Sequence, residues 1–366
     1  MKFRSAWALL LALVLTAAAC GSDSETDSSA SDSASASEAS ASASEASASE
    51  TSDDEEAMED EEAMEDEEAM ADDDCSGSYT YESYLSEIEV PRGPEKIAVF
   101  DLAVLASLDE LGVPIDAEDG FASLGTPLPA EYEELVATPQ SLGTVFEPDL
   151  EALNALEPDL IIVAQRSQRL LEDLVALDIA PVADFTQFDE AGTDFFDEFS
   201  RMHRHMGEVF CVQDEVETAL SELQTSIDAI AAAAPEAGPA LVLQTTGAEV
   251  TAFGPGAFRF GQVYDTYGFV AADESLARDE THGDPVSYEF IAEAEPDILF
   301  VVDRAAAVGE EGESAEALLD NPLVAATGAA ESDNIFYVDS FDWYIVFNGL
   351  PGVRGVAEDL SAAVDG

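Results

Sequence analysis

The sequence predicts an α/β protein made of two similar lobes that one long helix joins, with a ligand cleft between the lobes. Three observations support this fold class. Helical and buried-strand patterns alternate from Lys96 onward, a segment recurs 138 positions later in the chain, and a long amphipathic stretch separates its two copies.

The first 20 residues have the pattern of an export signal. Lys2 and Arg4 precede an apolar run over residues 6–19, which is too short for a membrane-spanning helix of about 20 residues. Small residues then precede Cys20, which resembles the bacterial lipobox, where this cysteine is lipidated. We therefore expect residues 1–20 to be a lipoprotein signal peptide that places the protein outside the cytoplasm, anchored at the outer face of the cell membrane. The alternative is an ordinary signal peptide in which Cys20 is incidental.

Residues 21–74 are predicted to be a disordered acidic tether. They are rich in Ser, Ala and Glu, and the sequence Glu-Asp-Glu-Glu-Ala-Met occurs at 59–64 and again at 65–70. The segment has 22 acidic residues, no Lys or Arg, and almost no apolar side chains large enough to bury. Such a chain cannot offset the entropy cost of ordering, and self-repulsion extends it. Cation binding by the repeat is the less favoured alternative.

The remaining chain is strongly acidic. Of the 80 acidic residues, 58 follow the tether, against ten basic ones, so residues 75–366 carry a formal charge of −48. This charge excludes nucleic acid as a partner by repulsion and suits a salty exterior. It also makes each arginine informative, because only Lys96 and nine arginines lie in this part of the chain.

The first half contains two buried strands and two helical segments. A strand from Lys96 to Phe100 precedes a helical pattern from Leu102 to Leu111, and glycine and proline follow it. A second helical pattern runs from Pro148 to Leu156, and Pro-Asp separates it from the apolar strand Leu160–Ala164. This alternation favours parallel α/β layers and an N-terminal lobe over residues 75–212.

The halves are joined by a predicted helix from Asp214 to Ala234. Its apolar residues recur at steps of three or four, which is typical of one buried helix face. We expect a bridging helix over residues 213–236 and a C-terminal lobe over 237–366, in which a strand begins at Ala240 and a last helix covers about Pro351–Val364.

The internal repeat places one arginine in each half. Glu151, Pro158 and Arg166 match Glu289, Pro296 and Arg304, and each arginine directly follows an apolar strand. Ligands of open α/β sheets bind beyond the carboxyl ends of the strands. Arg166 and Arg304 therefore predict an anion site between the lobes.

Two further features bear on chemistry. Cys75 and Cys211 form an even pair outside the cytoplasm if Cys20 carries lipid, so a disulfide between them is plausible, although the sequence does not show whether they are close enough. The chain contains no nucleophile elbow, phosphate-binding glycine loop, zinc-protease motif or Cys-x-x-Cys. We expect no enzymatic activity.

The order of segments resembles the class III periplasmic binding proteins of ABC importers, and within them the enterobactin/petrobactin-type catecholate-siderophore binding lipoproteins. The segments that carry this resemblance are Lys96–Leu102, Thr251–Pro255, Arg259–Gly261, Thr281–Gly283, Pro296–Arg304 and Trp343–Tyr344. The resemblance implies a ferric siderophore of the catecholate class as the ligand; haem or cobalamin on the same fold is the alternative.

The resemblance assigns three arginines to the ligand: Arg166, Arg259 and Arg304. A ferric tris-catecholate is trianionic, and guanidinium offers fixed charge and several directed donors. The alternative for each arginine is an ion pair with one of the abundant surface carboxylates. No intrinsic cofactor is expected, because Fe³⁺ arrives within the siderophore complex.

The same resemblance implies that His282 and Tyr344 complete the iron coordination when a siderophore supplies only two catechols. The alternatives are a loop or capping role for His282 and a half-buried aromatic position for Tyr344. His203 and His205 lie in a charged helical stretch and are expected at the surface. Second-rank candidates for the cleft walls, with core positions as the alternative, are Phe253, Phe258, Phe260 and Trp343.

The remaining implication concerns partners. In the family, one glutamate on each lobe contacts the permease dimer, and the repeat selects Glu151 and Glu289 for this role. The expected partners are therefore a ferric catecholate and an ABC permease dimer with its ATPase. The protein is expected to be a monomer that meets the membrane through its lipid anchor alone.

Overall fold

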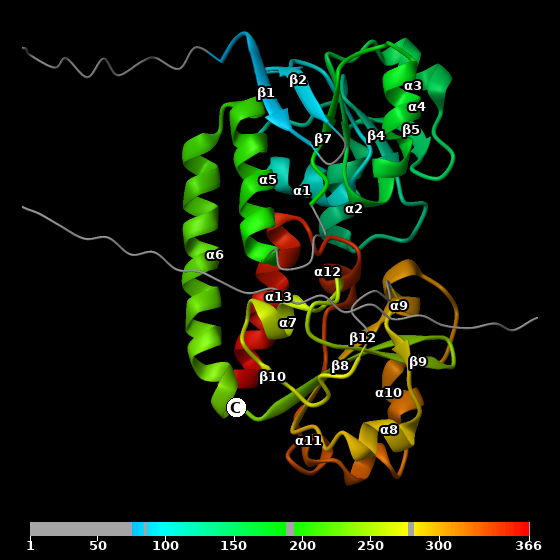
Figure 1. Cartoon of the computed structure of the whole chain (residues 1–366). Coiled ribbons are helices and arrows are strands. Elements are labelled where there is room, and N and C mark those ends of the chain that lie inside the picture. The colour runs from blue at the N-terminus through cyan, green and yellow to red at the C-terminus, as the bar shows by residue number, and fades with distance from the viewer. Residues whose placement is uncertain (1–74, 84–85, 188–193, 277–281, 366) are drawn as a thin grey trace, which may run out of the picture. The chain divides into compact units, whose positions relative to one another are not determined.

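The computed structural model describes residues 75–366 apart from 84–85, 188–193, 277–281 and 366. The predicted signal peptide, Cys20 and the acidic tether lie outside the described residues. The described chain contains two large sheets, each flanked by helices, and a two-stranded hairpin, and a long helix runs past both large sheets (Figure 1). The predicted α/β fold class is confirmed.

The N-terminal lobe holds a parallel five-stranded sheet in the order β5-β4-β3-β6-β7. Its strands are β3 (Ile97–Val99), β4 (Gly120–Ser123), β5 (Gln140–Thr144), β6 (Leu160–Val163) and β7 (Val182–Asp184). An antiparallel hairpin of β1 (Ser78–Glu82) and β2 (Glu87–Pro91) precedes this sheet. Both strands predicted in this half, at 96–100 and 160–164, lie in its centre.

Helices cover both faces of this sheet, which explains why its central strands β3 and β6 are apolar throughout. In β3, Ile97 and Val99 join a central core with α1 (Leu102–Glu110), whereas Ala98 faces an outer core. The outer core is closed by α3 (Leu150–Leu156) and α4 (Leu171–Ala176). The lobe also contains α2 (Ala130–Ala137) and the 3₁₀ helix η1 (Gln165–Leu170).

The C-terminal lobe holds a six-stranded mixed sheet. Its path is β11-β9-β8-β12-β13, with β10 paired to β8; β9 is antiparallel to β8, whereas β12 is parallel to β8 and β13. The strands are β8 (Pro239–Thr246), β9 (Glu249–Phe253), β10 (Val270–Ala271), β11 (Asp284–Pro285), β12 (Ile298–Asp303) and β13 (Ile335–Tyr337). The helices are η2 (Ala234–Glu236), α7 (Gln262–Asp265), α8 (Tyr288–Glu293), α9 (Arg304–Val308), α10 (Ala315–Leu319), η3 (Val324–Ala326), α11 (Gly328–Glu331) and α12 (Ser340–Tyr344).

The internal repeat has the same local geometry in both lobes. A left-handed residue follows each helix and precedes Pro-Asp: Glu157, at φ 50°, directly after α3, and Glu295, at φ 47°, two residues after α8. The backbone N–H of Asp159 donates to the Lys96 carbonyl at 2.8 Å, and that of Asp297 donates to the Pro239 carbonyl at 2.8 Å. Each turn thus aligns its strand with the first parallel strand of its own lobe, β3 or β8.

The long helix between the two large sheets is α6 (Gln213–Ala233), and η2 carries the chain on to Glu236. Its 21 residues correspond to about 31 Å at 1.5 Å per residue. Its apolar face joins the central core, and α5 (Phe195–Phe210) packs beside it. A single rigid element therefore accompanies both sheets.

The last helix, α13 (Leu350–Val364), provides a second connection that the sequence analysis did not anticipate. It packs against α1 of the N-terminal lobe as well as against α6. The Leu350 N–H donates to the Ser107 hydroxyl at 2.9 Å, and Arg354 pairs with Glu110 at 2.7 Å. The chain segment placed in the C-terminal lobe by sequence therefore also contacts the N-terminal lobe, through the first turns of α13.

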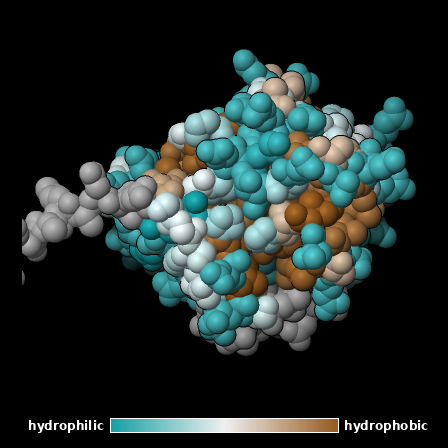
Figure 2. Space-filling model, turned by 90° about the horizontal axis from the view of Figure 1, so that it is seen from above, coloured by the Kyte–Doolittle hydropathy of each residue, from teal (hydrophilic) through white to brown (hydrophobic). Residues whose placement is uncertain are grey.

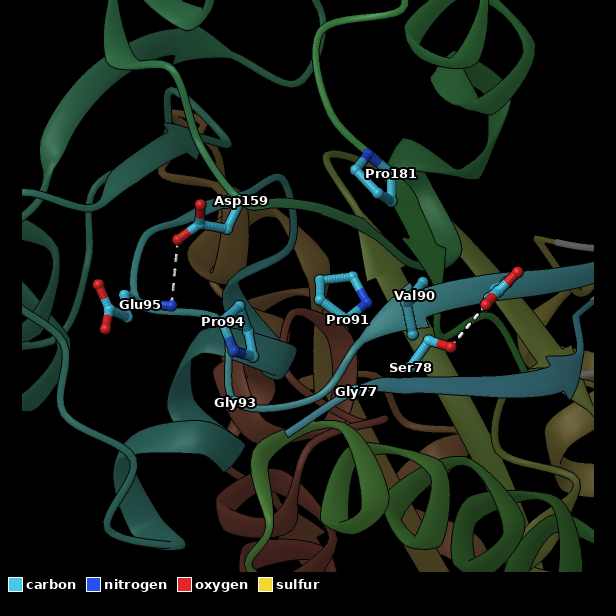
Figure 3. Close-up of a pocket in the computed structure, with 10 residues that line it drawn as sticks. Gly77, Ser78, Val90, Pro91, Gly93, Pro94, Glu95, Asp159 and Pro181 are labelled. Carbon is cyan, nitrogen blue, oxygen red and sulfur yellow. Dashed lines mark hydrogen bonds between the residues drawn. The ribbon is translucent and has the colours of Figure 1, made fainter. Parts of the chain in front are cut away.

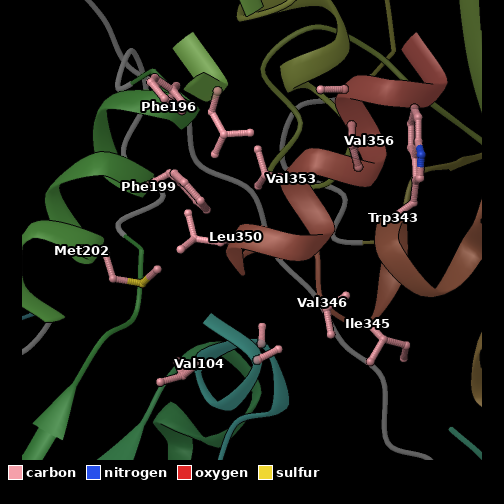
Figure 4. Close-up of a cluster of buried hydrophobic side chains, with 14 of the residues drawn as sticks. Val104, Phe196, Phe199, Met202, Trp343, Ile345, Val346, Leu350, Val353 and Val356 are labelled. Atoms are coloured by element: carbon pink, nitrogen blue, oxygen red, sulfur yellow. The ribbon is translucent and has the colours of Figure 1, made fainter. Parts of the chain in front are cut away.

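One central hydrophobic core runs through these connections. Side chains from α1, α5, α12 and α13 converge in it, including Val104, Phe199, Trp343 and Leu350 (Figure 4). The outer surface differs: the face seen in Figure 2 is mostly hydrophilic, with separate hydrophobic patches. None of the helices in the described ranges has the length and apolar character needed to cross a membrane.

The expectation that both histidines of α5 lie at the surface is wrong. His203 is fully buried: its Nδ1 lies 2.8 Å from the Phe199 carbonyl and its Nε2 lies 3.2 Å from the Ser107 hydroxyl. His205 is half-buried, with Nδ1 2.9 Å from the Tyr79 hydroxyl. Neighbouring charges in the sequence misled the prediction, because they occupy other faces of the same helix.

The structure pairs Cys75 with Cys211 in a disulfide, with their Cα atoms 5.8 Å apart. Cys211 caps the C-terminal end of α5, and Cys75 is the first described residue of the chain. The Gly93 N–H donates to the Val209 carbonyl at 2.8 Å beside this bridge. The start of the described chain is therefore held against the junction of α5 and α6.

Candidate functional site: an arginine cluster around Tyr344

Two arginines of the cluster come from equivalent positions of the two sheets. Arg166 lies in η1, directly after β6, and Arg304 is the first residue of α9, directly after β12. The carboxyl ends of parallel strands present the side chains that follow them at one edge of a sheet. Arg166 and Arg304 both contact one shared side chain, Tyr344.

Tyr344, the last residue of α12, lies at the centre of the cluster. Its ring is 7% exposed, and the guanidinium carbons of Arg166, Arg259 and Arg304 lie 5.5, 4.4 and 5.6 Å from the ring centre. The aromatic face attracts cations and so stabilises part of this arrangement. Three positive charges around one ring nevertheless repel one another, so the cluster suits an anionic ligand.

Two of the arginines already have hydrogen-bond acceptors. Arg166 donates from Nη1 to the Ile345 carbonyl at 2.9 Å and from Nη2 to the Tyr344 carbonyl, so it reaches from the N-terminal lobe to the end of α12. Arg304 donates from Nε to the Tyr344 hydroxyl at 3.1 Å and from Nη1 to the Glu310 carboxylate at 3.2 Å. Carbonyl, hydroxyl and carboxylate groups of the protein therefore already accept hydrogen bonds from Arg166 and Arg304.

Arg259 differs from both, because its buried Nε and Nη1 have no hydrogen-bond partner among the described residues. It comes from the turn between β9 and α7, beside Phe260, which adopts φ 64°. Burial, and next the charge of Arg166, lower the pKa of Arg259 to about 10. A buried guanidinium with unpaired donors costs free energy unless an acceptor binds there.

A carboxylate behind the cluster partly balances it. Asp101 is buried at the N-terminus of α1, where its side chain accepts from the N–H groups of Ala103 and Val104. Burial raises the pKa of Asp101 to about 6, although the charge of Arg166 acts in the opposite direction. Asp101 was not predicted as a site residue. Its one distinguishing feature in the sequence is a position suited to capping the helix that begins at Leu102.

Asn348 is a second residue that the sequence analysis missed. Its side chain is fully buried, and neither its Oδ1 nor its Nδ2 has a partner in the part of the chain that the structure describes. It follows Phe347, whose ring centre lies 5.6 Å from the Arg259 guanidinium carbon. In the sequence, Asn348 is the one polar side chain in the apolar run 345–350, which could have marked it as buried. Buried amides are normally hydrogen-bonded, so an unpaired one indicates a site that a ligand can complete.

His282 is not joined to this cluster. It is an exposed residue in the turn before β11, and no interaction within the described ranges links it to Tyr344 or to an arginine. The next residue, Gly283, has φ 75° and packs so closely that a Cβ there would lie 2.8 Å from the Phe253 ring. The proposed pairing of His282 with Tyr344 at iron stays a prediction.

The predicted aromatic walls are largely core residues. Phe253, Phe260 and Trp343 are each 1% exposed, and the Phe260 ring contacts both of the others. Trp343 also donates from Nε1 to Asp359 at 2.8 Å. Phe258 is half-buried against Phe347. Of these residues, only Phe258 retains the exposure that a cleft wall requires.

Glu151 and Glu289 occupy the same place in the two lobes. Each is the second residue of its helix, α3 or α8, and each is exposed. Side chains of Asp149 and Ser287 cap the two helices by accepting backbone N–H groups. The repeat therefore presents both carboxylates at matching positions of the two helices.

A separate hollow lies beside the β1–β2 hairpin (Figure 3). It has a volume of about 650 Å³, and Glu95, Asp159 and Pro181, which precede β3, β6 and β7, help to line it. It therefore lies at the amino ends of the strands, away from Arg166. Its charged lining residues are all acidic, so it does not suit an anion.

Two α/β lobes, one long connecting helix and a cationic cluster contributed by both lobes define the class, a two-lobed binding protein whose candidate site suits an anionic ligand. The sequence matches the periplasmic binding protein family over residues 97–340, and the chain belongs to this family.

Named relatives specify the comparison further. The petrobactin-binding protein YclQ of Bacillus subtilis strain 168 is 29% identical over 280 residues, which cover 76% of this chain and 84% of YclQ. The ferric-anguibactin-binding protein FatB of Vibrio anguillarum is 29% identical over 284 residues, which cover 76% of this chain and 85% of FatB.

Solved structures agree with these relatives. The crystal structure of YclQ matches with a TM-score of 0.70 at 28% identity, covering 79% of this chain and 99% of that one. The periplasmic catecholate-siderophore binding protein VctP from Vibrio cholerae matches with a TM-score of 0.70 at 27% identity, covering 78% and 100%. The resemblance drawn from the sequence is confirmed.

Proposed function

We propose that this protein captures a ferric siderophore, a catecholate, outside the cytoplasm and delivers it to an ABC iron importer. The observation that carries the proposal is the pair of buried, unpaired donors on Arg259 within a cluster of three guanidinium groups. A trianionic ferric catecholate supplies both the charge and the oxygen acceptors that this cluster lacks. YclQ binds petrobactin, FatB binds ferric anguibactin and VctP binds catecholate siderophores, which supports a ferric siderophore as the ligand here.

The three arginines would share the catecholate oxygens. Arg259 binds with donors that are already free, whereas Arg166 and Arg304 exchange some protein acceptors for ligand oxygens. The catechol rings also offer flat faces on which guanidinium groups stack. Haem and cobalamin, the alternatives on this fold, make less use of three converging arginines.

Tyr344 and His282 would bind the iron of a siderophore that provides only two catechols. Ferric iron favours phenolate oxygen and also accepts imidazole. Tyr344 is already at the centre of the arginine cluster, and His282 is exposed on the turn before β11. Because metal binding displaces protons, both side chains would bind in their deprotonated forms. The iron itself is cargo, and the proposal includes no resident cofactor and no catalysis.

The proposal for cellular placement follows the sequence. Lipid on Cys20 would anchor the chain, residues 21–74 would tether it, and the folded part would act as a monomer with lobes at 75–212 and 237–366 around the helix at 213–236. Glu151 and Glu289 would contact the permease dimer. Both are exposed, and Leu150 beside Glu151 is 44% exposed, which gives that lobe an apolar contact next to the charge.

Trp343 provides the test, because it is the single tryptophan that remains once the segment containing Trp7 is removed. It adjoins Tyr344, so a ferric catecholate that absorbs in the near ultraviolet and visible should quench its fluorescence on binding. We would titrate residues 21–366 with ferric tris- and bis-catecholates, haem and cobalamin, and use Arg259→Gln as the control variant. Tighter binding of haem or cobalamin than of every ferric catecholate would overturn the proposal.

A further inference from the structure

The short helix α9 and the turn that ends it place the acidic side chain of Glu310 against Arg304, one of the arginines proposed to bind the ligand. α9 begins at Arg304 and ends after five residues at Gly309, which has φ 68°. The N–H groups of Gly309 and Glu310 donate back to the carbonyls of Ala306 and Ala305, at 3.2 and 2.8 Å. This Schellman-type ending requires the left-handed conformation that glycine adopts without strain. It fixes the direction of the chain so that Glu310 meets Arg304.

The ion pair that results is partly exposed. The Glu310 carboxylate lies 3.2 Å from Nη1 of Arg304, and the two side chains are 55% and 24% exposed. Water can therefore solvate Glu310 readily if it leaves, whereas Arg304 keeps its second contact with the Tyr344 hydroxyl. Exposed ion pairs of this kind are weak, so an anionic ligand can displace the carboxylate.

The loop that carries Glu310 also touches the other lobe. A Cβ on Gly309 would collide with the ring of Pro127 and would lie 2.6 Å from its Cγ. Pro127 belongs to the loop that follows β4 in the N-terminal lobe. Glu310 is thus one residue from a contact between the lobes, as well as in contact with a guanidinium of the cluster.

We propose that Glu310 is a built-in competitor for the ligand, which occupies a donor of Arg304 in the ligand-free protein and is displaced when anionic oxygens bind. This inference rests on the proposed function. A displaced carboxylate stays close to the bound complex and repels it, so Glu310 lowers affinity and favours release. Its effect is greatest for a trianion and small for a neutral ligand, because repulsion scales with ligand charge.

The chain supplies a matched control for this proposal. Glu311 is the next residue, is equally acidic and exposed, and has no contact with Arg304 within the described ranges. Glu310→Gln and Glu311→Gln remove the same charge from the same loop. Only the first removes a direct competitor, so a difference between them separates contact from the general field of an acidic surface.

The experiment is a double-mutant cycle on residues 21–366, with a ferric tris-catecholate as the probe. We expect Glu310→Gln to bind about two- to five-fold more tightly than wild type, the range that one exposed ion pair supports. Glu311→Gln should change the dissociation constant by less than half of that. In an Arg304→Gln background, Glu310→Gln should change the dissociation constant no more than Glu311→Gln does, because only the general repulsion of the ligand remains.

The outcomes separate this inference from the proposed function. If wild type binds the probe but Glu310→Gln behaves like Glu311→Gln, or keeps its full effect without Arg304, the competitor role is wrong and the proposed function stands. If wild type binds no ferric catecholate, the proposed function fails and the inference fails with it. Added salt should reduce the Glu310 effect, because it screens an exposed pair.

Discussion

Replacing Arg259 with methionine should stabilise the ligand-free protein while removing ligand binding. The pKa of Arg259 is lowered to about 10 by burial and by Arg166, so folding disfavours its charged form. The sign follows from proton linkage: a cation with a depressed folded pKa loses stability as pH falls below its unfolded pKa, and the loss is complete below about 10. With 1.36 kcal/mol for each pKa unit, the charge costs at most about 3 kcal/mol at pH 7.

Favourable contacts offset part of this cost. The Arg259 guanidinium lies 4.4 Å from the Tyr344 ring centre and 5.6 Å from that of Phe347, and such contacts contribute about 0.5–2 kcal/mol. We therefore expect Arg259→Met to raise the free energy of unfolding by about 1–2 kcal/mol, measured by urea denaturation at pH 7. The variant would also lack the two charged hydrogen bonds that Arg259 makes to the ligand, at about 1.5–3 kcal/mol each, so the affinity for the ligand should fall more than about 100-fold.

Arg166→Met is the matched control. Arg166 is also a partly buried arginine of the cluster, but it donates to the backbone carbonyls of Ile345 and Tyr344. Its removal leaves these carbonyls without their donor, which should cost about 1–3 kcal/mol of stability. If Arg259→Met destabilises the protein by more than about 1 kcal/mol, or binds a ferric catecholate like wild type, the account of Arg259 as a destabilising ligand residue is refuted.

Three other predictions concern separate parts of the chain. Burial lowers the pKa of His203 from 6.5 to about 4, so its contribution to stability is complete above pH 6.5 and is lost toward pH 4. Between pH 7.5 and pH 4.5, the free energy of unfolding measured in urea should fall by about 2–3 kcal/mol more for wild type than for His203→Gln. An equal fall in both proteins would contradict this coupling of His203 protonation to stability. His282→Ala and Tyr344→Phe should weaken a tetradentate ferric complex and spare a hexadentate one in fluorescence titrations; equal weakening would assign both residues to pocket shape instead. Exchanging Glu151 and Glu289 for arginine should leave ligand affinity unchanged and reduce transport by reconstituted permease at least about ten-fold, whereas unimpaired transport would exclude a docking role.

The features predicted correctly have short-range signals. Apolar strands buried on both faces identified β6 and β12, and the Pro-Asp turns before them made the repeat visible. Once the repeat is recognised, the topology of parallel strands places Arg166 and Arg304 at carboxyl ends. α6 was equally accessible, because its apolar residues follow the helical period over its whole length.

The features that were missed depend on packing between distant segments. The position of Tyr344 among three guanidinium groups requires both lobes, and no local pattern encodes it. The burial of His203 could have been predicted, because Phe199, His203 and Met206 recur at helical spacing and all three are buried. The charged residues between them concealed this stripe.

The arginine cluster and the acidic exterior act over different distances. Residues 75–366 carry a formal charge of −48, which opposes the approach of a trianionic ligand, but salt screens this field over about 8–10 Å. Within the cluster, the guanidinium groups act at contact distance, where their charge is screened least. Anions that cannot fit between Arg166, Arg259 and Arg304 therefore meet the repulsion without the compensating contacts. An acidic surface around a small cationic site selects ligands by shape and oxygen placement instead of by charge alone.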